Sequence, residues 1–161
     1  MISLQISGQS DIEGVLRGTS AATKKRIGME AIIRALTPIL DEASSRATDS
    51  VETGNLKESL GFRVIPYKKG GKIFAVIGPR KGFKKPDPSG KGFRVASKYA
   101  HLVEFGHIGA GGKFVAAKPF MRPAFAAKNR LALSIMGVYL GQRIEIEAKR
   151  QARRRARTAK S

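Results

Sequence analysis

Apolar residues between positions 20 and 49 recur at steps of three and four, which is the spacing of one face of an α-helix. The pattern predicts a long helix over this range, and Pro38 should kink or restart it because proline lacks an amide donor and clashes with the preceding turn. A shorter helix over residues 11–17, capped by Ser10, is expected before it. The apolar positions of the long helix are Ile27, Ala31, Ile32, Ala35, Leu36, Ile39, Leu40 and Ala43.

The segment that follows the long helix has the sequence TGNLKESL over residues 53–60. Either Thr53 or Asn55 could cap a short helical turn there, because both side chains accept hydrogen bonds from helix N-terminal amides. The turn would carry Leu56 and Leu60 toward the core.

Two apolar runs, at 62–65 and 73–77, flank a turn rich in glycine and lysine and predict a β-hairpin. Residues 80–98 come next and combine glycine and proline with seven basic side chains, so we expect a loop too polar to pack. Unstructured loops longer than about 12–15 residues are usually functional or disordered. We therefore expect this basic loop to be mobile.

A short helix is expected over residues 97–105, ended by Gly106. Its apolar side comprises Tyr99, Leu102, Val103 and Phe105. A second long helix is predicted over residues 123–157, interrupted only by Gly137 and Gly141. At 1.5 Å per residue it would be roughly 50 Å long, whereas a domain of this size has a radius of gyration of about 13–15 Å. The basic end of the helix should therefore project. Its apolar positions are Leu131, Leu133, Ile135, Met136, Tyr139, Leu140 and Ile144.

Together these elements predict an α+β fold, in which a small antiparallel sheet packs against a long N-terminal helix and a long C-terminal helix with a basic extension. We expect residues 1–147 to form a single domain and residues 148–161 to form the arginine-rich extension.

The charge is divided unevenly along the 161 residues. The whole chain has 31 Lys and Arg against 12 Asp and Glu, a net charge of +19. Residues 1–60 hold seven basic and eight acidic side chains, a net charge of −1, so residues 61–161 hold 24 basic and four acidic ones, a net charge of +20. Such a field attracts nucleic acid, acidic protein or anionic lipid.

Composition also limits the class of protein. The chain has no Cys, which excludes a disulfide scaffold, thiol chemistry and Cys-ligated zinc. No apolar run approaches the roughly 20 residues that span a bilayer, and the first ten residues lack the features of a signal peptide. We expect a protein that is made in the cytoplasm and has no membrane partner.

The basic extension has a pattern of its own, because Ala148, Ala152 and Ala156 would line one face of a helix and arginines would cover the rest. Like charges at these spacings oppose an isolated helix, so the segment either orders on a partner or stays a frayed, solvated tail. The candidate contacts to a protein partner or to DNA are Lys84, Lys85, Arg150, Arg153, Arg154, Arg155 and Arg157.

Candidate chemistry is sparse. His101, Glu104 and His107 resemble a metal-ligand set of two histidines and a carboxylate, but no second acidic cluster or general base lies nearby in the sequence. Exposed or interfacial histidines with a structural glutamate are the favoured interpretation. The glycine-rich stretch 106–112 lacks the Gly-Lys-Ser/Thr ending of a phosphate-binding loop. We therefore expect no enzyme activity, no metal and no cofactor.

Three stretches, read in order, carry a family resemblance: TGNLKESL at 53–60, YAHLVEFG at 99–106 and KPFMRPA at 118–124. They resemble the small tail-component proteins of long-tailed bacteriophages, also called tail completion or neck proteins. The resemblance covers roughly residues 10–145. The matching positions are Thr53, Gly54, Leu56, Ser59, Tyr99, Glu104, Phe105, Gly106, Pro119, Phe120, Met121, Arg122, Pro123 and Ala124.

The resemblance implies a structural subunit of a hexamer-like ring between the capsid connector and the tail tube, which helps to join the tail to the DNA-filled head. It implies a location in the virion neck. Its partners would be copies of itself, an adjacent connector or stopper protein, a tail terminator or tail tube protein, and the DNA in the channel. Tail completion and tail termination both remain open. His107 stands where the family commonly has threonine, and the extension after Glu147 is more basic than the motifs require.

Alternatives remain at several positions. Glu104 could pair with Arg122 or Arg94 of a neighbouring subunit, or, as we favour slightly, it could be an intramolecular cap or a solvated carboxylate. Phe120 and Met121 could anchor an interface or pack in the core.

The rival function is a free nucleic-acid-binding protein that grips phosphates with the basic loop and the extension. Tyr67, Phe83 or Phe93 would then be available for stacking on bases.

Overall fold

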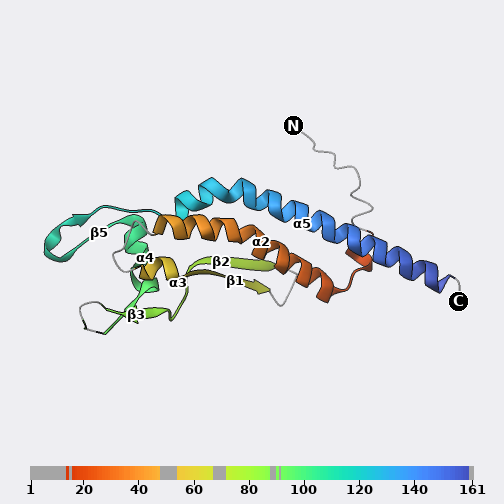
Figure 1. Ribbon diagram of the computed structural model, residues 1–161, viewed down its shortest axis with the longest axis horizontal. Coiled ribbons are helices and arrows are strands. Elements are labelled where there is room, and N and C mark those ends of the chain that lie inside the picture. The colour runs from red at the N-terminus through yellow and green to blue at the C-terminus, as the bar shows by residue number, and fades with distance from the viewer. Residues whose placement is uncertain are drawn as a thin grey trace.

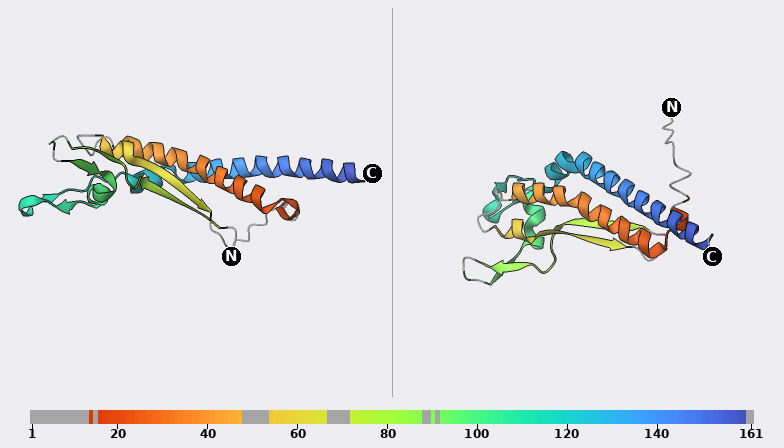
Figure 2. Two further views of the ribbon diagram at one scale, coloured as in Figure 1. Left: turned by 90° about the horizontal axis from the view of Figure 1, so that it is seen from below. Right: turned by 45° about the vertical axis from the view of Figure 1, so that its right-hand side comes forward.

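The computed structural model describes residues 14, 16–47, 54–66, 72–87, 90 and 92–159. Two long helices lie side by side, and a β-hairpin runs along one of them (Figure 1). Short strands and two short helices gather at one end of the molecule, and the C-terminal helix extends beyond the other end (Figure 2).

The first long helix, α2, spans Ala21–Ala47 and confirms the helix predicted from the apolar spacing. It is continuous through Pro38, so it does not restart there. Its start is capped by Ser20, whose hydroxyl oxygen accepts a hydrogen bond from the Thr23 amide. Of the shorter helix expected at 11–17, residues 14, 16 and 17 are helical, and the rest, with the Ser10 cap, lies outside the described residues.

The second long helix, α5, spans Met121–Thr158 and is continuous through both of its interior glycines. It is antiparallel to α2, because its start, middle and end contact α2 in reverse order (Figure 1). The contacts are Lys128 with Glu42, the Tyr139 hydroxyl with the Glu30 carboxylate, and Gln151 with Thr19 just before α2. The predicted projection is confirmed, and the extension is helical as far as Thr158.

The predicted hairpin is also confirmed. Strand β1, Leu60–Pro66, pairs antiparallel with β2, Ile73–Pro79. The short helix α3, Asn55–Ser59, precedes β1, and Leu56 and Leu60 are buried as predicted. Asn55 does not cap this helix: the N-cap is Gly54, at φ 63°, and the alternative cap, Thr53, lies outside the described residues.

The prediction that residues 80–98 would not pack was wrong. Strand β3, Lys84–Pro86, pairs antiparallel with β4, Phe93–Val95, and the Asn55 side-chain amide donates a 3.1 Å hydrogen bond to the Arg94 carbonyl. The described glycines near these strands have positive φ, at Gly82, Gly90 and Gly92. They therefore serve as turns between short strands. The mobility of the segment stays a prediction.

Helix α4, Ala96–Phe105, confirms the short helix predicted here, and it ends at Gly106 with a φ of 76°. The chain then forms strand β5, His107–Ile108, a 3₁₀ turn, η2, at Ala110–Gly112, and strand β6, Phe114–Val115. The two strands pair antiparallel. We call residues 107–115 the arm, because they extend from the end of the molecule that lies opposite the C-terminus (Figure 1).

The core consists of few large and many small side chains. One cluster joins the end of α2 to α3, α4 and the start of α5, and a second joins the middle of α2 to α5. Alanine lets the helix backbones approach closely, and Phe120 and Leu56 fill the first cluster. The fold is α+β as predicted, and the described residues form three two-stranded sheets. The first cluster contains Ala43, Ala47, Leu56, Leu60, Ala96, Ala100, Phe120 and Ala124.

Candidate assembly interface

Two of the three family-like motifs meet where α4 ends and α5 begins. The Glu104 carboxylate accepts hydrogen bonds from the backbone amides of Phe120 at 2.8 Å, Met121 at 3.0 Å and Arg122 at 3.1 Å. The first amides of a helix have no intrahelical acceptor and carry partial positive charge. A carboxylate at this position accepts their hydrogen bonds and also offsets the charge. Glu104 therefore fixes the start of α5 on the end of α4.

The charge of Glu104 is favoured despite its burial. Burial raises the pKa of this carboxyl, but the three backbone amides and the Arg122 side chain lower it further, so the net pKa lies below the ordinary value. Arg122 Nε donates to the carboxylate at 3.1 Å. Both charged partners are thus in the same chain, as in the intramolecular cap, and pairing with Arg122 or Arg94 of a neighbouring subunit stays a prediction.

The aromatic residues at this junction differ from one another in burial. Phe120 is only 1% exposed, so its ring packs in the core, whereas Met121 is half-buried and packs against the same cluster, and its role as an interface anchor stays a prediction. Phe105 was expected on the apolar side of its helix, but it is 64% exposed, with the Arg122 guanidinium 4.7 Å from its ring centre. The side chain lies at the end of α4, where that cation is its partner.

The first motif lies in the adjoining core. Leu56 and Ser59 are fully buried, and the Ser59 hydroxyl donates a 2.7 Å hydrogen bond to the Leu56 carbonyl. Tyr99 packs against this cluster. In the third motif, Pro119 is exposed and Pro123 is half-buried in the first turn of α5, where proline disturbs a helix least. Of the described motif residues, Leu56 and Phe120 therefore pack in the core and Glu104 caps α5, whereas Phe105 and Pro119 lie at the surface.

The structure uses the Glu104 carboxylate for helix capping and leaves His101 exposed at the surface. His107 is half-buried at the start of β5. Within the described ranges, no three His, Asp or Glu side chains come together as a metal-ligand group.

The candidate cationic contacts lie at opposite ends of the molecule. Lys84 and Lys85 belong to β3, where Lys85 pairs with Glu58 and Lys84 lies over the Phe93 ring. The arginines of the extension lie at the far end of α5 (Figure 1). The structure therefore does not combine the two basic concentrations into one surface.

The end of α5 carries a strip of cations. A shallow hollow there is lined by Ile146, Lys149, Arg150, Arg153, Arg154 and Arg157. Glu145 pairs with Lys149 and Glu147 pairs with Arg150, so acids of the same helix offset part of the charge. The strip is suited to an acidic surface or to phosphates.

The sequence analysis missed the exposed apolar side chains of the arm. Ile108 is 74% exposed and Phe114 is 73% exposed, and the two residues are partners across the β5–β6 pair. Val115 follows and is also exposed. Exposed apolar patches are typical of protein interaction sites. The sequence did contain a signal for this surface. Large apolar residues occur there within a glycine-rich stretch, and their spacing fits neither a helix nor a strand.

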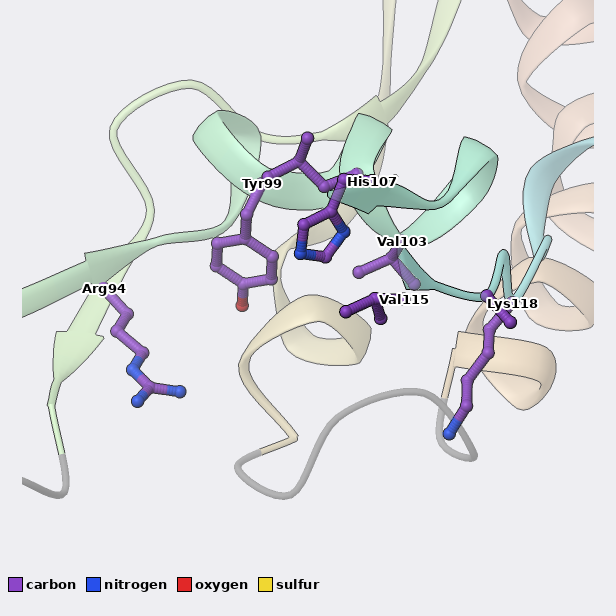
Figure 3. Close-up of a pocket in the computed structure, with 8 residues that line it drawn as sticks. Arg94, Tyr99, Val103, His107, Val115 and Lys118 are labelled. Atoms are coloured by element: carbon purple, nitrogen blue, oxygen red, sulfur yellow. The ribbon is translucent and has the colours of Figure 1, made fainter. Parts of the chain in front are cut away.

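A pocket of about 290 Å³ lies beside the arm. In Figure 3 the Tyr99 and His107 rings lie between Arg94 on one side and Val103, Val115 and Lys118 on the other. Residues from β4, α4, β5, β6 and the segment before α5 thus form one cavity. Its apolar lining comprises Tyr99, Leu102, Val103, Val115 and Ala116.

Comparison with known proteins identifies the family. A family model described as "Bacteriophage HK97-gp10, putative tail-component" matches residues 18–106, which is more than half of the chain. The chain belongs to this HK97-gp10-like family of phage tail components. No curated protein and no solved structure matches it.

The match runs from the segment before α2 to the end of α4 and includes the stretches 53–60 and 99–106. The stretch 118–124 and the whole of α5 lie beyond it. A tail component contacts other phage proteins in the virion tail. None of the described helices combines the length and apolar composition needed to cross a bilayer.

Proposed function

We propose that this tail component is a structural subunit of a ring in the phage neck, where it helps to join the tail to the DNA-filled head. Membership of the HK97-gp10-like family carries the proposal. The elongated shape supports it, because an apolar arm lies at one end and a basic helix end at the other (Figure 2). Subunits of a closed ring bind head to tail, which requires two different surfaces on each copy.

The proposed role is structural and not catalytic. Among the motif residues that the structure describes, Glu104 acts in capping and Phe120 in packing. The partners would be copies of this chain in a hexamer-like ring, an adjacent connector or stopper protein, and a tail terminator or tail tube protein. The ring would stack on its neighbours as a tail-terminator ring does. It would assemble in the host cytoplasm and remain in the virion neck.

For the basic end of α5, we favour docking on an acidic neighbouring virion protein over contact with channel DNA, because a channel that gripped DNA strongly would hinder ejection. The second candidate function, free nucleic-acid binding, draws on the same strip of arginines. A free binder should bind duplex DNA with a binding constant whose logarithm falls steeply, with a slope of several units, as the logarithm of the salt concentration rises. A neck subunit should bind DNA poorly when it is alone.

Electron microscopy of lysates from a phage that lacks this gene tests the joining role. Separate DNA-filled heads beside finished tails are the expected result. Tails of uncontrolled length would reassign the protein to tail termination. Intact, normally tailed particles would overturn the neck role and favour the nucleic-acid binder.

A second experiment tests the basic end within the phage, by replacing Arg153, Arg154, Arg155 and Arg157 with Gln. We expect assembly or DNA retention to fail. Four exposed cations outside α2 and α5, Lys57, Arg63, Lys81 and Lys98, provide a control that removes the same charge. Normal particles with unchanged DNA retention in the arginine variant would contradict both the docking and the DNA role.

A further inference from the structure

The pocket beside the arm has an apolar interior and a cationic border. Arg94 and Lys118 contribute positive charge, and no Asp or Glu is among the described residues that line the cavity. Asp87 lies outside it and accepts a 2.8 Å hydrogen bond from Arg94 Nε, so one carboxylate offsets part of this charge. A ligand that brings both apolar surface and a negative charge fits these walls best.

Two buried polar atoms at the pocket lack hydrogen-bond partners, the Tyr99 hydroxyl and His107 Nδ1. The Asn55 amide lies near the Tyr99 hydroxyl, but neither Asn55 Oδ1 nor the hydroxyl has a hydrogen bond of normal geometry. Buried polar atoms are nearly always paired in folded proteins, and leaving one unpaired costs about 1–3 kcal/mol. These two atoms have almost no exposed surface of their own, so a ligand would contact the apolar and cationic lining and not them.

The apolar surface continues from the pocket onto the arm. Val115 lines the cavity and belongs to β6, and its neighbours Ile108 and Phe114 are largely exposed. A partner that inserts one side chain into the pocket could cover these residues as well. Interfaces of this form concentrate their binding energy in one buried apolar anchor surrounded by a polar rim.

We propose that the pocket binds a short acidic segment of another virion protein, with an apolar side chain in the cavity and an adjacent carboxylate against Arg94 and Lys118. Charge complementarity favours such a partner over a second copy of this chain, because each copy carries a net charge of +19. The inference rests on the proposed function only in placing the partner in the virion. The preference of the pocket for acidic, apolar peptides is measurable without the phage.

Fluorescence anisotropy of the full chain with labelled synthetic peptides tests the proposal. The first peptide has the sequence Glu-Leu-Phe-Glu, the second replaces both apolar residues with Ala, and the third replaces both Glu residues with Lys. The first should bind, and each of the others should bind at least about tenfold more weakly, since each lacks one half of the recognition. Equal binding of all three peptides would overturn the proposal.

Matched variants locate the binding. Ala116→Trp should fill the pocket and Lys118→Glu should reverse its charge, and each should weaken the first peptide roughly tenfold. The controls are Ala117→Trp, which changes an exposed neighbour outside the pocket lining, and Lys24→Glu, which reverses an exposed cation on α2. Both should leave binding within about twofold. Equal losses in variants and controls would contradict a site in this cavity.

Sedimentation of the same variants tests the competing occupant. If Ala116→Trp abolishes self-association of the chain and Ala117→Trp does not, the pocket is a contact between copies and the acidic partner is wrong. The gene-deletion phage separates this inference from the neck role: specific peptide binding with normally tailed deletion particles would keep the pocket and remove the neck role. Separate heads and tails in the deletion phage, with no peptide binding by the protein, would keep the neck role and overturn the pocket proposal.

Discussion

Glu104 accepts a 2.8 Å hydrogen bond from the backbone amide of Phe120, which lies 16 residues further along the chain. This contact closes the arm between α4 and α5 and places Phe120 in the core. The same carboxylate binds the next two amides and the Arg122 side chain. One side chain therefore ties the first turn of the 38-residue helix α5 to the end of α4.

Replacing Glu104 with Gln should lower the free energy of unfolding by about 1–3 kcal/mol, because a neutral amide is a weaker acceptor and its NH₂ group faces backbone donors. Urea unfolding followed by circular dichroism measures the change. Glu145→Gln, which alters an exposed carboxylate on α5, is the control and should leave the free energy of unfolding nearly unchanged. Equal stability of the two variants would show that the cap is unimportant.

Acid should destabilise the fold through the same group. The pKa of Glu104 is below its ordinary value of 4.5 in the folded chain, so the folded state binds the proton less readily than the unfolded state. Its contribution is therefore complete above about pH 4.5 and is lost as pH falls through the folded pKa. Unfolding curves from pH 7 to pH 3 should show less acid destabilisation in Glu104→Gln than in the natural chain. Identical pH profiles would assign acid sensitivity to other carboxylates.

Replacing two glycines with alanine should change the stability of the fold in opposite directions. At Gly106, φ is 76° and an added Cβ would lie 2.8 Å from the Val115 carbonyl oxygen, so Gly106→Ala should cost at least about 1–2 kcal/mol. At Gly137, inside α5, a Cβ would meet nothing within 4 Å, so Gly137→Ala should stabilise the chain by about 1 kcal/mol. Thermal unfolding of both variants measures these changes. A stabilising alanine at Gly106 would contradict the described turn.

Core packing at the junction is tested with two phenylalanines. Phe120→Ala should cost about 3–5 kcal/mol, because it leaves a cavity in the first core cluster. Phe114→Ala removes an equal side chain from the exposed arm and should cost less than about 0.5 kcal/mol. Denaturant midpoints of the two variants give the comparison. A similar loss in both would mean that the arm is packed in solution.

The sequence alone was sufficient for the elements whose signal is local. The three- and four-residue apolar spacing predicted α2 and most of α5, because helical periodicity depends only on neighbours along the chain. The apolar runs around 67–72 likewise predicted the β1–β2 pair. The segment 80–98 was misinterpreted because its glycines and prolines mark turns equally well in a loop and between short strands.

Contacts between distant residues were decided only by the tertiary structure. The sequence left two roles open for Glu104 and for Phe120, and the chain path chose capping for one and core packing for the other. The path also separated Lys84 from the arginines of α5 and assembled a pocket from five segments. Sequence spacing reports which residues share a face of one element, but which faces meet depends on how the elements pack.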